Sequence, residues 1–272
     1  MTDSVAAPAS GASSVRALSG PALGILGIAL FLAAWELVSR TGIVDSRYLP
    51  PASDVLTVCA QNLGEGRFWG DVGHTMTGWA VGLAIASVGA IVLGLVIGSS
   101  HFLRRLTHST IEFLRPIPSV ALIPLAVLLF GTSLQSTLLL VVYASFWQVL
   151  IQVLYGVGDV DPVAGDTARS YGLGAFARVR YLVWPTALPY VMTGLRLGAA
   201  VALILAVTGE LVIGGGGLGY RIALSQSGGA EAQMYALVLA TGLIGVLINL
   251  VMRFVERRSL RWHVSVRAEA AP

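Results

Sequence analysis

Six long apolar segments constrain the fold of this 272-residue chain more than any other feature of its sequence. Each approaches the roughly 20 apolar residues that an α-helix needs to cross a lipid bilayer. Charged residues make up only 11% of the chain, whereas a soluble domain carries about 25%. The sequence therefore predicts an all-α integral membrane protein with six transmembrane helices, at residues 21–39, 75–98, 114–130, 137–154, 189–212 and 234–252.

The six segments fill one membrane domain, residues 21–262, between polar tails at 1–20 and 263–272. The first segment lacks a clean cleavage site, so we expect a retained signal-anchor helix. All 17 basic residues are arginine, and arginine accumulates in cytoplasmic loops. With the N-terminus inside, only a few fall on the outer side: Arg40, Arg47, Arg67 and Arg221. Both termini and segment 159–185 are therefore expected in the cytoplasm, and no arginine run indicates nucleic-acid binding.

Segment 159–185 is longer and more structured than a connection between two membrane helices needs to be. Asp161 is a good N-cap, and Pro162 suits the first position of a helix. The pattern predicts a helix over residues 163–171, which Gly172 ends in the left-handed conformation.

A second helix is predicted over residues 175–183, and Pro185 is expected to stop it. In the first helix, Asp166 offers a carboxylate to a partner, and the small side chain of Ala168 permits close approach of another surface. The segment is therefore a candidate docking surface. The alternative is a solvated loop whose helix lies on the bilayer.

Four further residues are candidates for a transport pathway or gate. Pro118 and Pro124 interrupt the third apolar segment, and Pro124 is expected to bend it, either to line a cavity or as a purely structural kink. Arg196 lies near the cytoplasmic end of the fifth segment and is expected to snorkel to the interface or to reach a neighbouring helix or segment 159–185. The alternative is contact with the cargo. Glu210 lies at the outer end, where it can order the glycine-rich residues that follow.

Two other features indicate how the helices pack. Glycines four residues apart allow close helix contact in lipid, and the second and fifth segments contain such pairs at Gly78/Gly82, Gly94/Gly98 and Gly194/Gly198. Residues 41–74 predict a short amphipathic helix capped by Ser53 or Asp54, with Phe68 and Trp69 as anchors at headgroup depth.

Segment 159–185 resembles the cytoplasmic motif of bacterial ABC-transporter permeases, which reads Glu-Ala-Ala, three residues, Gly, nine residues, Ile, one residue, Leu-Pro. The aligned residues, with both spacers of matching length, are Asp166, Thr167, Ala168, Gly172, Leu182, Trp184 and Pro185. This chain departs from the pattern in three places, with Asp for Glu, Thr for Ala and Trp for Leu. The shorter Asp side chain changes the geometry of any salt bridge made there.

Further blocks between Arg47 and Trp262 look like the sulfonate, taurine and nitrate branch of these permeases, among them residues 48–55, 115–118, 193–196 and 217–220. The resemblance implies a type I importer fold in the bacterial plasma (inner) membrane and a homodimeric channel. It also implies two ATPase subunits docked on the helix around Asp166–Gly172, and an external substrate-binding protein that delivers a small anionic nutrient. The sequence does not name that nutrient.

The absence of lysine excludes a Walker A loop, because its lysine contacts the β/γ-phosphates. ATP and Mg²⁺ are therefore expected on the partner ATPase, and no cofactor is expected in this chain. A G-x-G-x-x-G pattern begins at Gly214, but it follows a membrane helix rather than the strand that a dinucleotide site requires. We expect residues 214–220 to form a flexible outer loop.

Two other classes of protein were weighed. A secondary transporter driven by an ion gradient is the alternative function, but the sequence shows no inverted repeat and its acidic residues lie near segment ends. A membrane-embedded enzyme or metal protein is disfavoured, because the single Cys59 and the scattered histidines form no catalytic or metal-binding pattern.

Overall fold

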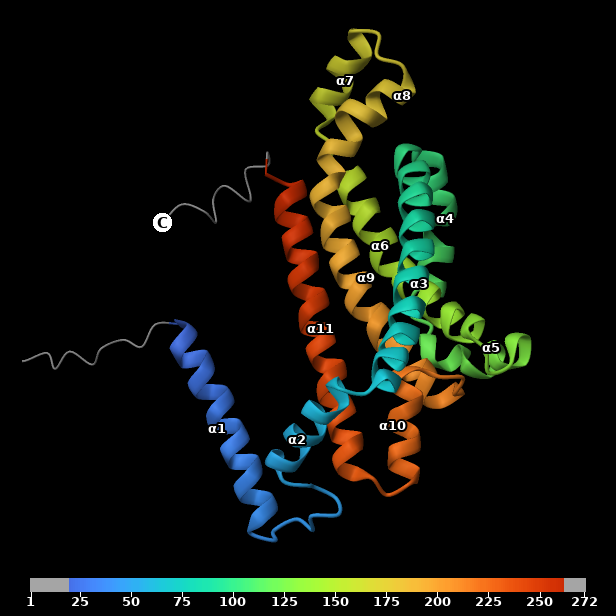
Figure 1. The fold of residues 1–272 in the computed structure, drawn as a ribbon. Coiled ribbons are helices and arrows are strands. Elements are labelled where there is room, and N and C mark those ends of the chain that lie inside the picture. The colour runs from blue at the N-terminus through green and yellow to red at the C-terminus, as the bar shows by residue number, and fades with distance from the viewer. Residues whose placement is uncertain (1–19, 262–272) are drawn as a thin grey trace, which may run out of the picture. The chain divides into compact units, whose positions relative to one another are not determined.

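The computed structural model describes residues 20–261, and helices form all regular structure in that range (Figure 1). The all-α prediction is confirmed. The predicted tails lie outside the described residues, except for Gly20. The elements are α1 (Gly20–Arg40), α2 (Ala52–Leu63), α3 (Gly66–Ser99), α4 (His101–Leu114), a 3-10 turn (Ser119–Leu122), α5 (Ile123–Phe130), α6 (Leu134–Gly158), α7 (Pro162–Ser170), α8 (Ala175–Arg178), a π-helical turn (Val179–Val183), α9 (Trp184–Ile213), α10 (Gly217–Ser227) and α11 (Glu231–Ser259).

Within these residues, 5 helices are long and apolar enough to cross a membrane, or 6 if one bent pair counts as a single span. The bent pair is α4 with Ser119–Phe130, and its two parts meet at 81°. The predicted third span, 114–130, is therefore wrong as one helix. Pro116 and Pro118 lie in the break, where each lacks an N–H and clashes with the preceding turn.

The expected bend at Pro124 is also wrong. Pro124 lies in the first turn of α5, where the N–H that proline lacks would have no partner within the helix. The bend instead falls between Leu114 and Ser119.

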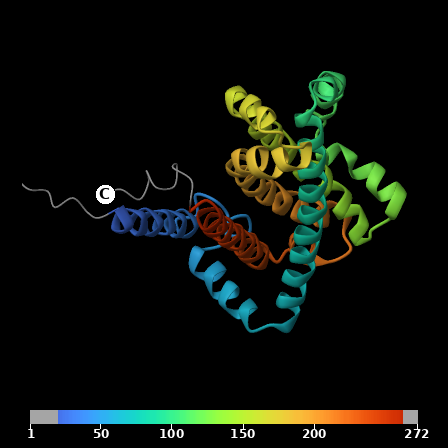
Figure 2. The same ribbon diagram turned by 90° about the horizontal axis from the view of Figure 1, so that it is seen from above.

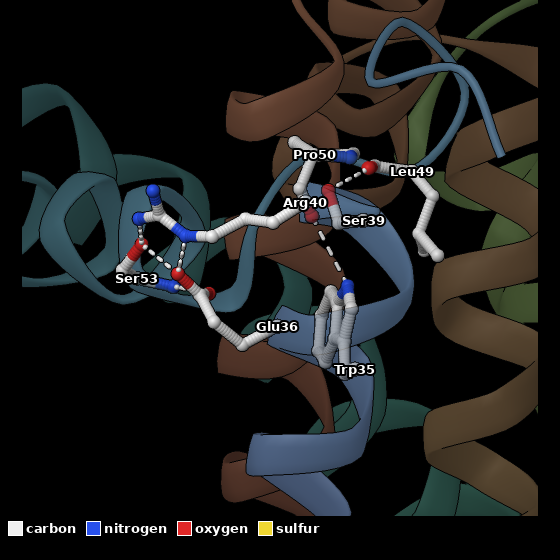
Figure 3. A network of polar contacts seen from close by, with 7 residues as sticks. All are labelled: Trp35, Glu36, Ser39, Arg40, Leu49, Pro50 and Ser53. Carbon is white, nitrogen blue, oxygen red and sulfur yellow. Dashed lines mark hydrogen bonds and ion pairs between the residues drawn. The ribbon is translucent and has the colours of Figure 1, made fainter. Parts of the chain in front are cut away.

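The chain forms two compact units, and the first ends at Asp54. In this unit, polar contacts hold the segment after α1 against the end of that helix (Figure 3). Trp35 Nε1 donates to Pro50 O at 3.0 Å, and Ser39 Oγ donates to Leu49 O at 2.7 Å. These two hydrogen bonds hold the carbonyl groups of Leu49 and Pro50 against α1.

Glu36 completes this joint. Its carboxylate pairs with Arg40 Nε at 2.6 Å and accepts the N–H of Ser53 at 3.0 Å (Figure 3). Ser53 lies in the first turn of α2, whose N–H groups have no partner within the helix. Glu36 therefore supplies the cap that was expected from Ser53 or Asp54.

The second unit, from Val55 onward, is built around α6, which packs against α3 on one side and α9 on the other. Gly82, Gly94 and Gly98 of α3 lie over Val141, Val153 and Val157 of α6, respectively. Because the residue numbers of these contacts increase in the same direction along both helices, α3 and α6 run parallel. The predicted glycine pairs thus mark real helix contacts.

Helix α9 runs antiparallel to α6, because Gly198 contacts Val149 whereas Gly209 contacts Leu140. Trp79 of α3 also donates from Nε1 to Ala199 O of α9 at 2.8 Å. Figures 1 and 2 show α11 and α5 on opposite sides of this three-helix core.

One predicted membrane anchor is wrong. Phe68 is buried with Leu218 and Leu237, because the first turn of α3 packs against α10 and α11. Its neighbour Trp69 is exposed.

The α3–α6 contact predicts a steric response to substitution. A Cβ added at Gly94 would lie 2.6 Å from Val153 Cγ1, whereas one added at Gly89 meets nothing closer than Phe146 at 3.9 Å. We expect Gly94→Ala to lower the free energy of unfolding by about 1–3 kcal/mol through overpacking. Gly89→Ala should be neutral or slightly stabilising, because alanine favours helix. Thermal unfolding of the purified protein in detergent tests this, and equal midpoints for the two variants would contradict the packing argument.

Candidate functional site

Helices α7 and α8 extend beyond the ends of α6 and α9 (Figure 1); we call residues 161–183 the α7–α8 projection. Asp161 accepts the N–H of Val163 at 2.8 Å and so caps α7, with Pro162 at its first position. At the other end, the N–H groups of Gly172 and Leu173 donate to the carbonyls of Arg169 and Ala168 at 2.9 and 3.0 Å.

That pair of bonds, with Gly172 at φ +73°, is the Schellman arrangement that ends many helices. The predicted limits of the first helix are therefore confirmed to within one residue.

The projection presents a mixed polar and aromatic surface. Asp166 is 73% exposed, and its ion pair with Arg169, at 3.0 Å, is also exposed. Such pairs contribute about 0–1 kcal/mol, so the carboxylate can exchange partners at little cost. Tyr171 and Phe176 are 82% and 80% exposed. Exposed aromatic side chains are typical of a surface that binds another protein.

The other motif residues lie at the base of the projection or within α7. Thr167 donates its hydroxyl to Val163 O at 2.8 Å, and Ala168 is half-buried. Leu182 lies in the π-helical turn and Pro185 in the first turn of α9, and both are half-buried.

The expectation that Pro185 stops the second helix is wrong. The chain stays helical from Ala175 to Ile213, a stretch of 39 residues. A π-helical turn, Val179–Val183, ends two residues before the proline, and such turns accommodate irregular backbone hydrogen bonding within a helix. The projection is thus continuous with the membrane-spanning part of α9.

A hollow of about 330 Å³ separates the projection from the core, with Gly98, Val157, Arg169 and Leu182 among its lining residues. Arg178 also lines it, and its buried Nε has no hydrogen-bond partner among the described residues. The underside of the projection is therefore less tightly packed than the α3–α6–α9 core.

A buried polar cluster lies at the opposite end of α9; we call it the Glu210 network. The fully buried carboxylate of Glu210 accepts the Thr75 hydroxyl at 2.8 Å and the Gly219 N–H at 3.0 Å. His74 Nδ1 lies 3.3 Å from the same carboxylate, and Thr75 Oγ1 accepts the N–H of Leu218 at 2.9 Å. The network joins α3, α9 and α10.

Glycine allows α10 to approach this carboxylate. Gly217 has φ +88°, and a Cβ at that position would collide with the Glu210 carboxyl group. The expected flexible loop at residues 214–220 is therefore wrong from Gly217 onward, because Gly217, Leu218 and Gly219 are buried in the first turns of α10. The buried acid fixes a segment whose composition alone indicates flexibility.

The structure does not bring the four candidate pathway residues together. Arg196 Nη1 pairs with Glu256 of α11 at 3.1 Å, and it lies about 21 Å from Glu210 along α9. Pro118 and Pro124 belong to the bent pair. Sequence reasoning missed His74 and Thr75, because nothing near them in the chain indicates a partner some 135 residues away.

The described residues contain no group of three or more histidine, cysteine or acidic residues that could hold a metal ion. The spans, the exposed projection and the buried Glu210 network together describe a multi-pass membrane protein with a candidate docking surface at one end.

Residues 90–261 match the family described as binding-protein-dependent transport system inner membrane component. The chain belongs to this family of ABC-importer permeases. It is a non-catalytic transmembrane subunit and a multi-pass protein of the bacterial inner membrane. A system of this type includes an ATPase and a binding protein.

Two relatives and one solved structure illustrate the match. The chain is 30% identical over 245 residues to the taurine transport system permease protein TauC of Escherichia coli (strain K12), covering 88% of this chain and 89% of the relative. It is 27% identical over 240 residues to the putative aliphatic sulfonates transport permease protein SsuC of that strain, covering 88% and 91%. An inward-facing structure of the MetNI methionine ABC transporter has the same fold, with a TM-score of 0.61 at 18% identity over 69% of this chain and 94% of that one.

The Glu210 network predicts a stability effect that depends on its acceptor atoms. Glu210→Ala leaves the Thr75 hydroxyl and the Gly219 N–H without their acceptor, at about 1–3 kcal/mol for each buried group. Glu210→Gln keeps one acceptor oxygen and should lose less. Glu65→Gln serves as the control: Glu65 is a half-exposed acid that pairs with Arg221 at 2.7 Å, and Asp71 keeps its own pair with that arginine when Glu65 is neutralised. Thermal midpoints in detergent should rank Glu65→Gln above Glu210→Gln above Glu210→Ala, and equal midpoints would refute the role of the network.

Proposed function

We propose that this permease works as a homodimer that moves a small oxyanion of the sulfonate, taurine or nitrate kind into the cell by alternating access. The relatives named for taurine and aliphatic sulfonates, and the nitrate import permease protein NrtB of Leptolyngbya laminosa, at 25% identity, support this class of cargo. These cargoes share an oxyanion group.

The observation that carries the mechanism is the helical stretch that continues from α8, in the α7–α8 projection, into α9. A partner ATPase grips the cytoplasmic surface around Asp166, Thr167, Ala168 and Gly172. When the ATPase closes on ATP, the projection moves with it, and the π-helical turn containing Leu182 passes that displacement through Pro185 into α9. ATP and Mg²⁺ bind on the partner, because this chain lacks the lysine of a Walker A loop.

The external binding protein docks at the opposite end, where the Glu210 network holds α10 against α3. Arg196 links α9 to α11 through Glu256, and the bent pair with Pro118 and Pro124 adds a second place where helices can shift. These four residues are therefore proposed as gating positions rather than as one cargo site. Reversing a 1:99 population of two states requires about 5.5 kcal/mol of differential binding, which the nucleotide-bound ATPase and the loaded binding protein supply together.

The double variant Asp166→Ala/Gly172→Ala tests the coupling surface. Both residues are exposed, and no atom lies within 4 Å of a Cβ added at Gly172. Alanine at φ +73° costs about 1–2 kcal/mol, but this strain falls at the exposed end of α7, so the folded membrane domain should persist. We expect uptake by the assembled importer to fall about tenfold or more, and ATPase activity to lose its stimulation by the loaded binding protein. Asp54→Asn, an exposed acid of α2, is the matched control.

Unchanged uptake and stimulation in the double variant would refute the docking role. Uptake that survives ATP depletion but collapses with an ionophore would indicate a secondary transporter instead.

A further inference from the structure

A second cavity, of about 610 Å³, lies between α4 and the end of α6 that leads to α7. Its volume falls within the range of about 300–1,000 Å³ that is typical of small-molecule sites. It shares no lining residue with the hollow beneath the projection and contains none of the motif residues.

The polar face of α4 lines this cavity. Arg104, Thr107, His108 and Arg115 follow one another at helical spacing, and all four are lining residues. The apolar side chains of Phe102, Leu106 and Phe113 are exposed and do not line it. A helix beside lipid that directs ionisable residues inward and apolar residues outward is typical of one that borders a hydrated cavity.

The charge of the cavity is positive. Glu112 is its one acidic lining residue, and it lies 3.4 Å from His108 Nδ1. Arg104 donates from Nη2 to Gly98 O at 2.7 Å, which holds the side chain in place while leaving other guanidinium donors. Among residues 20–261, neither Arg104 nor Arg115 forms an ion pair with a carboxylate.

The remaining wall is apolar and firmly positioned. Ile97, Ile111, Ile151 and Leu154 line it. The Tyr143 hydroxyl donates to Leu114 O at 2.6 Å, which ties the end of α4 to α6 immediately before Arg115. The cavity therefore combines two guanidinium groups with an aliphatic surface.

We propose that this cavity binds oxyanions that carry a short apolar body, with Arg104 and Arg115 as two separate contacts, because these residues are 11 positions apart and so about 16 Å apart along the helix axis. Guanidinium groups bind such oxygens through paired, charge-assisted hydrogen bonds. An organosulfonate cargo and the phosphate of an anionic phospholipid share this chemistry. The assignment to cargo rests on the proposed function; the assignment of an oxyanion site rests on the cavity alone.

The first test measures binding of 1-butanesulfonate to the full chain in phosphatidylcholine nanodiscs by titration calorimetry. We expect wild type to bind and Arg104→Gln/Arg115→Gln to bind about tenfold or more weakly. Arg105→Gln is the matched control, because Arg105 neighbours Arg104 on α4 and does not line the cavity. Glu112→Gln should bind at least as tightly as wild type, since it removes the one carboxylate.

A second arm adds phosphatidylglycerol to the nanodiscs to separate the two sources of oxyanion. If this lipid weakens butanesulfonate binding only when both arginines are present, the headgroup uses the same site. If phosphatidylglycerol binds to wild type but not to the double arginine variant, and butanesulfonate binds to neither, the site is a lipid site. If neither binds, or if Arg105→Gln reduces binding as much as the double variant, the proposal is overturned.

Uptake by the assembled importer distinguishes this proposal from the proposed function. A wild-type importer that transports no sulfonate, taurine or nitrate would overturn the cargo class and leave the nanodisc result standing. Normal uptake and normal binding by Arg104→Gln/Arg115→Gln would overturn the cavity proposal and leave the importer assignment intact.

Discussion

The rest of the membrane domain depends on the close contact of α6 with α3 and α9. Neither a sheet nor a soluble core is present among the described residues to organise the helices, and lipid supplies no hydrophobic drive between them. Close contact at Gly82, Gly94 and Gly98 of α3, and at Gly198 of α9, replaces that drive with dispersion forces over matched surfaces. The arrangement fixes both the direction and the register of the three helices.

Helix α9 connects the features that bear on transport. At one end it continues into the α7–α8 projection, and at the other its Glu210 holds the start of α10. Because α9 lies against α6 over most of its length, a displacement of the projection acts on a packed bundle rather than on an isolated helix. The two ends of α9 differ in their freedom to move. The hollow beneath the projection is loosely packed, whereas the Glu210 network at the other end is held by hydrogen bonds.

Sequence reasoning succeeded where the physical causes are local. The cap at Asp161, the left-handed Gly172 and the five apolar spans other than residues 114–130 each depend on a few neighbouring residues, and the structure has them as predicted. It failed where contacts between distant segments decide the outcome. The glycines near Glu210 indicated a flexible loop, because the sequence gives no sign of the hydrogen bond that Thr75 donates to Glu210. Pro185 indicated a helix end, because a π-helical turn has no recognisable local signal.

The parallel register of α3 and α6 limits how the length of this chain can change during evolution. One residue inserted into α6 would rotate everything after it by about 100°. The valine at 153 would then no longer face Gly94 of α3, even though composition and hydropathy would hardly differ. Additions are tolerable in the connections, such as residues 41–48, but not between Val141 and Val157. Gaps in aligned relatives should therefore avoid the middle of this helix more strictly than its amino-acid variability suggests.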